Sequence, residues 1–129
     1  MAVGKLSTPL ARVRGLGSAR SGTADFWRQR LTSVAGVPLT IGFIIIVVSL
    51  LGRNHAAVVQ ILGSPFVAVV MLLFIATTCI HMRIGMQVII EDYVHDENRK
   101  LVLIMLNTFF CAAVGLASAF ANLMLSFKV

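Results

Sequence analysis

The chain contains few charged residues and very few acidic ones. Only 12% of its 129 residues are Asp, Glu, Lys or Arg, and the acids number five. Soluble domains carry about 25% charged and about 45–50% apolar residues, whereas 58% of this chain is hydrophobic. This composition excludes a soluble globular domain. It indicates an integral membrane protein of one domain, with room for three or four spans of about 20 residues each.

Cysteine is scarce as well. Cys79 and Cys111 both lie inside apolar stretches, and their spacing matches neither a metal site nor a disulfide framework. Buried cysteine usually behaves as a small hydrophobic residue. We therefore expect both side chains to serve in packing.

The basic residues are distributed unevenly along the chain. Eleven Lys and Arg against five acids give a net charge of +6, and six of the eleven precede the first apolar run. Beside a membrane span this bias indicates orientation rather than nucleic-acid binding, because basic segments stay on the cytoplasmic side, or on the matrix side in a mitochondrion. We therefore predict an inside N-terminus. The six residues are Lys5, Arg12, Arg14, Arg20, Arg28 and Arg30.

Residues 1–30 are interpreted as a basic cytoplasmic tail that leads into an interfacial segment. Residues 1–24 are rich in Gly, Ser, Ala and Arg and lack apolar periodicity, which predicts an extended or poorly ordered tail. Trp27 among basic residues is typical of an anchor at the headgroup level. The first apolar run is longer than that of a signal peptide, so we expect the tail to be retained.

Three apolar stretches, 31–51, 65–90 and 101–125, predict an all-α protein with three transmembrane helices in residues 31–129. Residues 56–62 predict a short interfacial helix. An inside N-terminus places residues 91–100, which hold four of the five acids, inside and the C-terminus outside.

Three further features refine the spans. Pro65 suits the first turn of the second span, and Pro38 falls early in the first, where local adjustments can absorb a kink. Small residues in the third span would let another helix approach closely. These small residues are Ala112, Ala113, Gly115, Ala117, Ser118 and Ala119.

The second span contains ionisable residues, in the segment HMRIGMQVIIEDYVHD (81–96). His81 and Asp92 are eleven residues apart, which is roughly 16 Å of helix. If Asp92 marks the inner boundary, His81 lies near the middle of a hydrocarbon core about 30 Å thick. An ionisable residue at that depth indicates a functional site.

Two roles fit His81. Its ring can hydrogen-bond a neighbouring helix, or it can be an axial ligand to a planar macrocycle such as haem. Gly85, one turn on, would leave a gap beside the imidazole, and Thr77 and Thr78, one turn back, offer hydroxyls, which favours ligation. With one histidine in the spans, a second axial ligand would come from another subunit, which predicts a hetero-oligomeric membrane complex.

The end of this span carries a carboxylate and a phenol. Asp92 shares a face with His81, since eleven residues at about 100° make three turns plus roughly 20°. Tyr93 lies about 100° further round, where it can hydrogen-bond a ligand arriving from lipid or serve as an ordinary belt tyrosine. Arg83 lies about 200° from His81 and is expected to meet an acid on a partner helix or to extend towards an interface.

The segment HMRIGMQVIIEDYVHD resembles the smaller hydrophobic membrane-anchor subunit of succinate dehydrogenase (complex II). That family shows a histidine in a span, a glycine four residues on, and Asp-Tyr eleven and twelve residues after the histidine. Upstream, GSARSGTADFWRQRLTSVAGVPL resembles the family's Gly-rich lead, with Trp and Arg, into its first span. The resemblance covers about residues 15–100.

The resemblance implies roles for four residues. His81 would be an axial ligand to the iron of haem b, with the other ligand from a larger cytochrome b anchor subunit. Tyr93 would donate a hydrogen bond to a ubiquinone carbonyl, and Asp92 would support that site's hydration and proton supply. Arg30 would lie near the haem propionates and the quinone. Arg83 receives no role.

The resemblance also implies what the chain does and where. It would anchor a flavoprotein subunit and an iron–sulfur subunit, which pass electrons from succinate to ubiquinone, without binding succinate itself. It would be a multi-pass protein of the bacterial or mitochondrial inner membrane.

Three alternatives remain open. One is a fumarate reductase anchor that runs the reaction backwards. Another is an ion-transport subunit in which His81, Arg83 and Asp92 relay protons, although the other spans carry few polar residues for such a path. The third is an assembly scaffold without haem. The polar residues in question are Thr40, Ser49, Asn107, Thr108 and Asn122.

Overall fold

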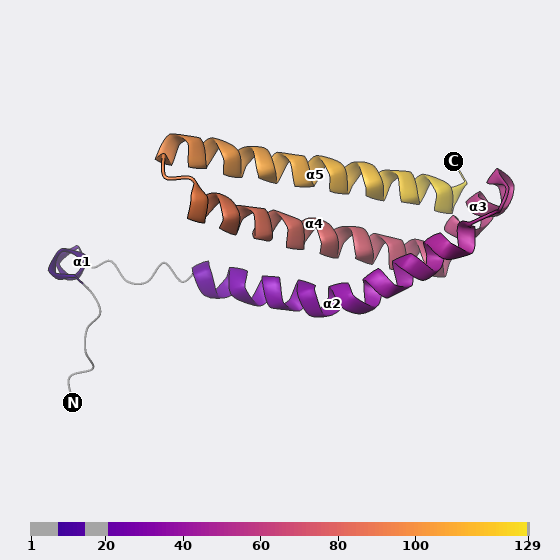
Figure 1. The fold of residues 1–129 in the computed structure, drawn as a ribbon, viewed down its shortest axis with the longest axis horizontal. Coiled ribbons are helices and arrows are strands. Elements are labelled where there is room, and N and C mark those ends of the chain that lie inside the picture. Colours follow the sequence, from indigo (N-terminus) through magenta and orange to yellow (C-terminus); the bar gives the residue numbers. More distant parts are fainter. Residues whose placement is uncertain (1–7, 15–20, 129) are drawn as a thin grey trace, which may run out of the picture.

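The computed structural model describes residues 8–14 and 21–128, and these residues form five helices. They are α1 (Pro9–Val13), α2 (Ser21–Leu50), α3 (His55–Leu62), α4 (Pro65–Tyr93) and α5 (Glu97–Phe127). Helices α2, α4 and α5 are long and apolar enough to cross a membrane. Figure 1 shows these three helices lying side by side, with α3 at one end. Helix α4 is the middle one, because it packs against both α2 and α5.

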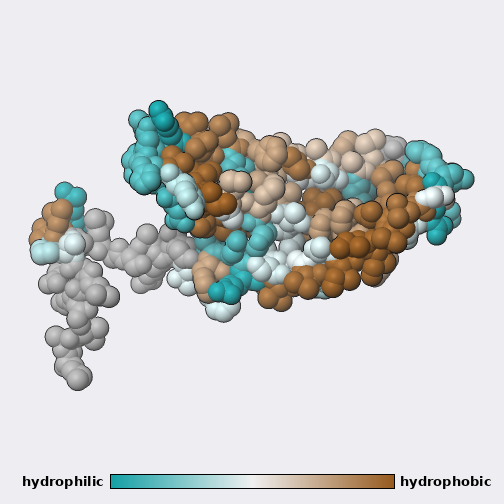
Figure 2. Space-filling view, viewed as in Figure 1, coloured by the Kyte–Doolittle hydropathy of each residue, from teal (hydrophilic) through white to brown (hydrophobic). Residues whose placement is uncertain are grey.

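The surface has the distribution expected of a membrane protein. Figure 2 shows hydrophilic residues gathered at the two ends of the three-helix unit and a mostly hydrophobic band between them. The predicted all-α architecture with three membrane-spanning helices is confirmed. We call the end that holds the α4–α5 turn (residues 94–96) the turn end, and the opposite one the α3 end. Figure 1 places the start of α2 at the turn end.

Helix α2 begins at Ser21, ten residues before the predicted start of the first span. No glycine or proline interrupts residues 23–35, and Asp25 and Arg28 form an ion pair of 3.6 Å one turn apart, so the helix continues through the basic segment. The predicted lack of structure was therefore wrong for α1 and for residues 21–24. The rest of that prediction, with Lys5 and Arg20, lies outside the described residues.

Proline shapes two of the long helices. Pro38 lies inside α2, and Figure 1 shows that α2 bends along its length. A proline removes one backbone hydrogen bond and crowds the preceding turn, which accounts for such a bend. Pro65 occupies the start of α4, as predicted, where its missing N–H costs nothing.

The α3 end is built from tight turns. Gly52 has a φ of +71° and follows α2, a backbone conformation that suits glycine after a helix end. Asn54 then caps α3 by accepting a hydrogen bond from the Ala57 amide at 2.9 Å. At Gly63 a Cβ atom would come within 2.7 Å of the Leu125 carbonyl oxygen, so the close approach to α5 requires glycine.

The turn end connects α4 and α5 in three residues. Helix α4 continues to Tyr93, three residues past the predicted end of the second span, so Asp92 and Tyr93 form its last turn rather than a loop. Asp96 caps α5 by accepting from the Asn98 amide at 3.1 Å. Glu97 follows in the first turn, where a negative charge interacts favourably with the helix dipole.

Helix α5 presents one stripe of residues to α4. Cys111 and Asn122 are buried, and a Cβ atom on Gly115 would lie 3.2 Å from the Cys79 sulfur. The close approach predicted for the third span is therefore confirmed at Gly115. Other predicted small residues point outward and are exposed. These are Ala112, Ala113 and Ala117.

Candidate functional site

The His81 side chain faces α2. Its Nδ1 atom lies 3.0 Å from the Thr32 hydroxyl, which is 49 residues away in the sequence. The same hydroxyl lies 2.7 Å from the Arg28 carbonyl and 3.1 Å from the Gln29 carbonyl, one turn earlier in α2. Both His81 and Thr32 are half-buried. The predicted interhelical hydrogen bond of His81 is therefore present, and it occupies one of the two ring nitrogens.

His81 and Thr32 line an open groove of about 770 Å³ between α2 and α4. Thr77 and Thr78, one turn before His81, line the same groove. On the α2 side Gly36 opens the wall, since a Cβ atom there would meet nothing within 4 Å. Apart from His81, none of the residues that line the groove has an ionisable side chain. They are Thr32, Ser33, Gly36, Val37, Thr40, Ile41, Thr77, Thr78 and Met82.

The space beside Gly85 differs from the expectation. The nearest group to a Cβ atom at Gly85 is the Gln29 amide nitrogen, 3.9 Å away. Gly85 is therefore faced by α2, and it is absent from the lining of the groove that holds His81. Gly36 supplies the gap that the sequence led us to place at Gly85.

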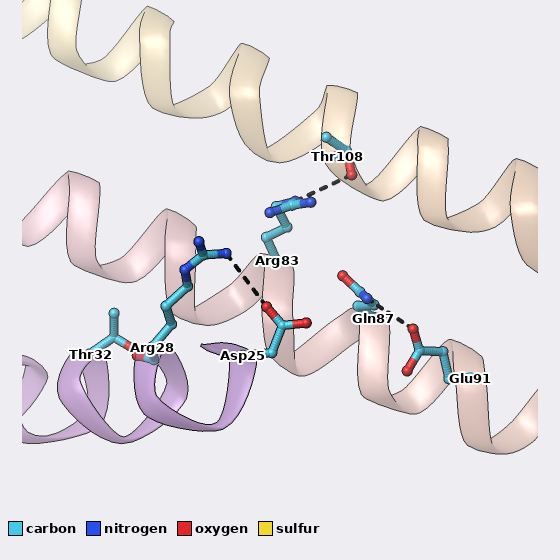
Figure 3. Close-up of polar contacts among 7 residues, drawn as sticks. All are labelled: Asp25, Arg28, Thr32, Arg83, Gln87, Glu91 and Thr108. Atoms are coloured by element: carbon cyan, nitrogen blue, oxygen red, sulfur yellow. Dashed lines mark hydrogen bonds and ion pairs between the residues drawn. The ribbon is translucent and has the colours of Figure 1, made fainter. Parts of the chain in front are cut away.

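A second cavity of about 540 Å³ lies nearer the turn end, also between α2 and α4. Arg30 and Glu91 line it, together with Gln29, whose side-chain oxygen is buried without a hydrogen-bond partner in the described part of the chain. The Arg30 guanidinium lies 5.1 Å from the centre of the Phe26 ring, a cation–π distance. Figure 3 shows two further polar contacts in this region. They are the Asp25–Arg28 ion pair and the 2.9 Å hydrogen bond from Gln87 to Glu91.

Asp92 and Tyr93 lie at the surface. Both are exposed, Tyr93 to 78%. Neither lines the groove of His81 or the cavity of Arg30. The fold thus brings Asp92, Tyr93 and Arg30 to the turn end without closing a pocket around all three. A ligand held by these residues needs further walls from another subunit or from lipid.

Arg83 contacts α5, on the opposite side of α4 from the groove. Figure 3 shows its guanidinium directed at Thr108, to which Nε donates a hydrogen bond of 3.3 Å. The backbone carbonyl of Arg83 also accepts a hydrogen bond of 2.9 Å from the side-chain amide of Asn107. The structure gives Arg83 a hydroxyl partner on α5, where the sequence led us to expect a carboxylate or an interface.

The chain also matches known proteins. The family described as "Succinate dehydrogenase/Fumarate reductase transmembrane subunit" matches residues 5–115. The chain belongs to this family.

Its relatives are anchor subunits by name. The "Succinate dehydrogenase hydrophobic membrane anchor subunit" of Paracoccus denitrificans is 32% identical over 110 residues, which is 85% of both chains. The "Succinate dehydrogenase membrane anchor subunit" of Reclinomonas americana is 32% identical over 90 residues, 67% of this chain and 75% of the relative. The anchor subunit of Rickettsia conorii is 28% identical over 105 residues, 79% of this chain and 82% of the relative. No solved structure matches the chain significantly.

Family membership confirms the resemblance seen in the segment 81–96. A succinate dehydrogenase/fumarate reductase transmembrane subunit with three membrane-length helices is a multi-pass inner-membrane protein that works in a complex with other subunits.

The fit of this site to a metal or haem can be judged from its donors. Among residues 8–14 and 21–128, no group of three or more His, Cys, Asp or Glu can hold a metal ion. A metal bound entirely by this chain is therefore not supported there. A haem iron takes one or two axial ligands from side chains, and a histidine that lines an open groove can supply one of them.

We did not predict from the sequence the residues of α2 that line the groove. Thr32, Gly36 and Thr40 all line it, and they recur every four residues. Residues four apart share a helix face, so this run of small and hydroxyl residues in an otherwise apolar span was a signal for the missing wall.

Proposed function

We propose that this chain is the membrane anchor subunit of a succinate:ubiquinone oxidoreductase. In this role it shares haem b with a larger cytochrome b anchor subunit, and it helps to form the site where ubiquinone is reduced. A flavoprotein subunit oxidises succinate, and an iron–sulfur subunit delivers the electrons. The single observation that carries the proposal is His81, set near the middle of a membrane-length helix and lining an uncharged groove.

His81 would hold the haem b iron in this proposal, together with a residue of the partner anchor subunit. Its Nδ1 is engaged by Thr32 at 3.0 Å, so the other ring nitrogen is the one that binds the iron. When bound, haem b accepts and returns single electrons. Gly36 and the threonines of α2 and α4 leave room for the flat ring edge and keep charge away from it.

Tyr93 and Asp92 act on ubiquinone at the turn end. The Tyr93 hydroxyl donates a hydrogen bond to a quinone carbonyl. Reduction of the quinone consumes two protons, and the exposed Asp92 carboxylate connects the site to water. Arg30, which lines the cavity between α2 and α4 near the turn end, adds positive charge for the haem propionates and the quinone. The iron–sulfur subunit and the larger anchor subunit close the pocket that this chain leaves open.

Two observations support the proposed direction of the reaction and the proposed orientation. The curated relatives are named for succinate dehydrogenase, which favours succinate oxidation over the fumarate reductase alternative. The turn end carries Arg28, Arg30, Arg99 and Lys100 against Arg53 and Lys128 at the α3 end. The basic end therefore faces the cytoplasm or the matrix, where the soluble subunits dock.

The ion-transport alternative is less well supported. The polar side chains of α5 bond α4 directly: Asn107 bonds the Arg83 carbonyl, and Asn122 bonds the Ala68 carbonyl, each at 2.9 Å. These groups hold two helices together and form no continuous path with His81, which faces α2. The scaffold alternative has no haem, so a spectrum of the purified complex distinguishes it from the proposed function.

The test is the reduced-minus-oxidised spectrum of the purified complex. The wild type should show a b-type band after dithionite reduction, and His81→Ala should lose it because the iron loses an axial ligand. His95→Ala is the matched control, since His95 is exposed in the α4–α5 turn, and it should keep the band.

Two results would contradict the proposal. A wild-type complex without a b-type band removes the haem, and an unchanged band in His81→Ala removes the ligand. His81→Met covers the case in which the alanine variant does not assemble, because a thioether on the iron shifts the band while an uninvolved side chain leaves it in place.

A further inference from the structure

The Thr32 hydroxyl has a single hydrogen, and its surroundings decide where that hydrogen goes. Two backbone carbonyls of α2 lie close to the oxygen, that of Arg28 at 2.7 Å and that of Gln29 at 3.1 Å. A carbonyl oxygen is an acceptor and can only receive the hydrogen. The Arg28 carbonyl is the shortest of the three contacts, so the hydroxyl donates to its own helix. Its lone pairs are then left to face His81.

The His81 Nδ1 atom lies 3.0 Å from that oxygen and must be the donor in this contact. A neutral imidazole carries one N–H, and the position of that hydrogen is set by the bond at the other nitrogen. With the hydrogen on Nδ1, Nε2 keeps its lone pair. The reverse arrangement, a hydrogen on Nε2, would leave Nδ1 and Thr32 both without a hydrogen to share.

We propose that Thr32 is the positioning residue of His81, which accepts its Nδ1–H and so holds the neutral tautomer whose Nε2 binds the haem iron. This inference rests on the proposed function, and it adds a residue of α2 to the surroundings of His81, for which the sequence pointed only to neighbours on α4. The two residues come from different helices, so their bond also fixes the plane of the imidazole relative to the groove. The groove residues other than His81 are uncharged, and none of them competes as a charged partner for the ring.

The bond should also affect the iron. A hydrogen bond from the free N–H of a ligating histidine makes the imidazole more electron-rich, and loss of such a partner typically weakens metal binding about 10–100-fold. An electron-rich ligand favours ferric over ferrous iron. Removal of the Thr32 hydroxyl should therefore raise the midpoint potential of the haem and weaken its retention by about tenfold.

The experiment compares two substitutions at Thr32 in the purified complex. Thr32→Val keeps the branched shape and removes the hydroxyl, whereas Thr32→Ser keeps the hydroxyl and removes the methyl. Ser49→Ala is the control, because Ser49 also bonds back to its own helix, to the Ile46 carbonyl at 2.6 Å, but lies towards the other end of α2. The readouts are the haem midpoint potential from a redox titration, the low-spin ferric electron paramagnetic resonance signal, and the haem retained after detergent dialysis.

The expected result is a more positive potential, a shifted ferric signal and faster haem loss in Thr32→Val. Thr32→Ser and Ser49→Ala should behave as the wild type does. Equal potentials in Thr32→Val, Thr32→Ser and the wild type would overturn the inference while leaving haem ligation intact. Equal changes in Thr32→Val and Ser49→Ala would assign the effect to the helix rather than to His81, and would overturn it too. A wild-type complex with no b-type haem would instead overturn the haem assignment, and this inference with it.

Discussion

Arg83 shows how a charged side chain is accommodated at hydrocarbon depth. Such a residue costs about 2.5–3.5 kcal/mol at the centre of a span by insertion scales. Thr108 accepts from its Nε, and the Arg83 backbone carbonyl receives the Asn107 amide, so both ends of the residue are tied to α5. A guanidinium has five N–H donors. Arg83 is half-buried, so its side chain keeps some access to its surroundings.

Tyr93 allows a direct test of the quinone contact. Tyr93→Phe keeps the ring and removes the hydroxyl, which in the proposed function donates to a quinone carbonyl. A neutral hydrogen bond contributes about 0.5–1.5 kcal/mol, so ubiquinone reduction should slow by about 2–10-fold. The measurement is the succinate-dependent reduction of a ubiquinone analogue by the purified complex.

The control for Tyr93→Phe is succinate oxidation with an artificial dye, which bypasses the membrane site and should stay at the wild-type rate. Unchanged ubiquinone reduction would show that Tyr93 does not contact the quinone. Parallel loss of both activities would show failed assembly rather than a lost hydrogen bond.

The two interfaces of α4 differ in chemistry. On the α5 side, Asn122 is buried and donates to the Ala68 carbonyl at 2.9 Å, while Gly115 lets the helices approach at Cys79. On the α2 side, contact is made by Thr32 on His81 towards the turn end and by the stacked rings of Phe43 and Phe74, 4.4 Å apart, further along. The α4–α5 interface holds two spans together, whereas the α2–α4 interface contains the groove.

Asn122→Ala should loosen the α4–α5 pair. Interhelical hydrogen bonds in membranes contribute about 0.6 kcal/mol on average and up to about 1.7 kcal/mol. We therefore expect Asn122→Ala to lower the free energy of unfolding by an amount of this size. Denaturation of the purified complex, monitored by loss of helical signal, measures the change.

Asn98→Ala is the matched control for Asn122→Ala. It makes the same change in helix propensity in the same helix, at an exposed position near the turn end. The two variants should differ by the value of the interhelical bond. Equal stability of the two would mean that the Asn122 contact contributes nothing.

The assembled shape of the chain explains why it needs partners. At most 6% of the residues in the most apolar window of each span are fully buried within the chain itself, so much of the hydrophobic surface is left for lipid or other subunits to cover. The groove of His81 is open, and Asp92 and Tyr93 are exposed, so all three side chains are accessible to lipid or to another subunit.

The predicted orientation can be read by cysteine labelling. Arg53→Cys places a thiol at the exposed α3 end and His95→Cys places one in the exposed α4–α5 turn. In intact bacterial cells an impermeant maleimide should label Cys at position 53, and it should label position 95 only after permeabilisation, because the basic turn end faces inward. The native chain, with Cys111 buried and Cys79 partly so, supplies the background. The opposite labelling pattern would invert the topology.

The sequence was sufficient for the features that depend on local composition. Apolar length predicts three spans, Pro65 marks a helix start, and the distance of His81 from Asp92 predicts its depth, because the rise per residue and the hydrocarbon thickness vary little. The family could also be read from the spacing of His81, Gly85, Asp92 and Tyr93. The start of α2 could not be placed in this way. Hydropathy marks where the apolar stretch begins, but the helix itself extends beyond that point into the polar segment.

Contacts between helices required the folded chain. His81 meets Thr32 across 49 residues, and Asn122 meets Ala68 across 54. Both contacts depend on how each helix is rotated about its axis. Helices that are apolar on every side, as membrane spans are, carry little pattern that fixes that rotation. For this reason the depth of His81 follows from the order of residues, whereas its partner and the groove beside Gly36 follow from packing.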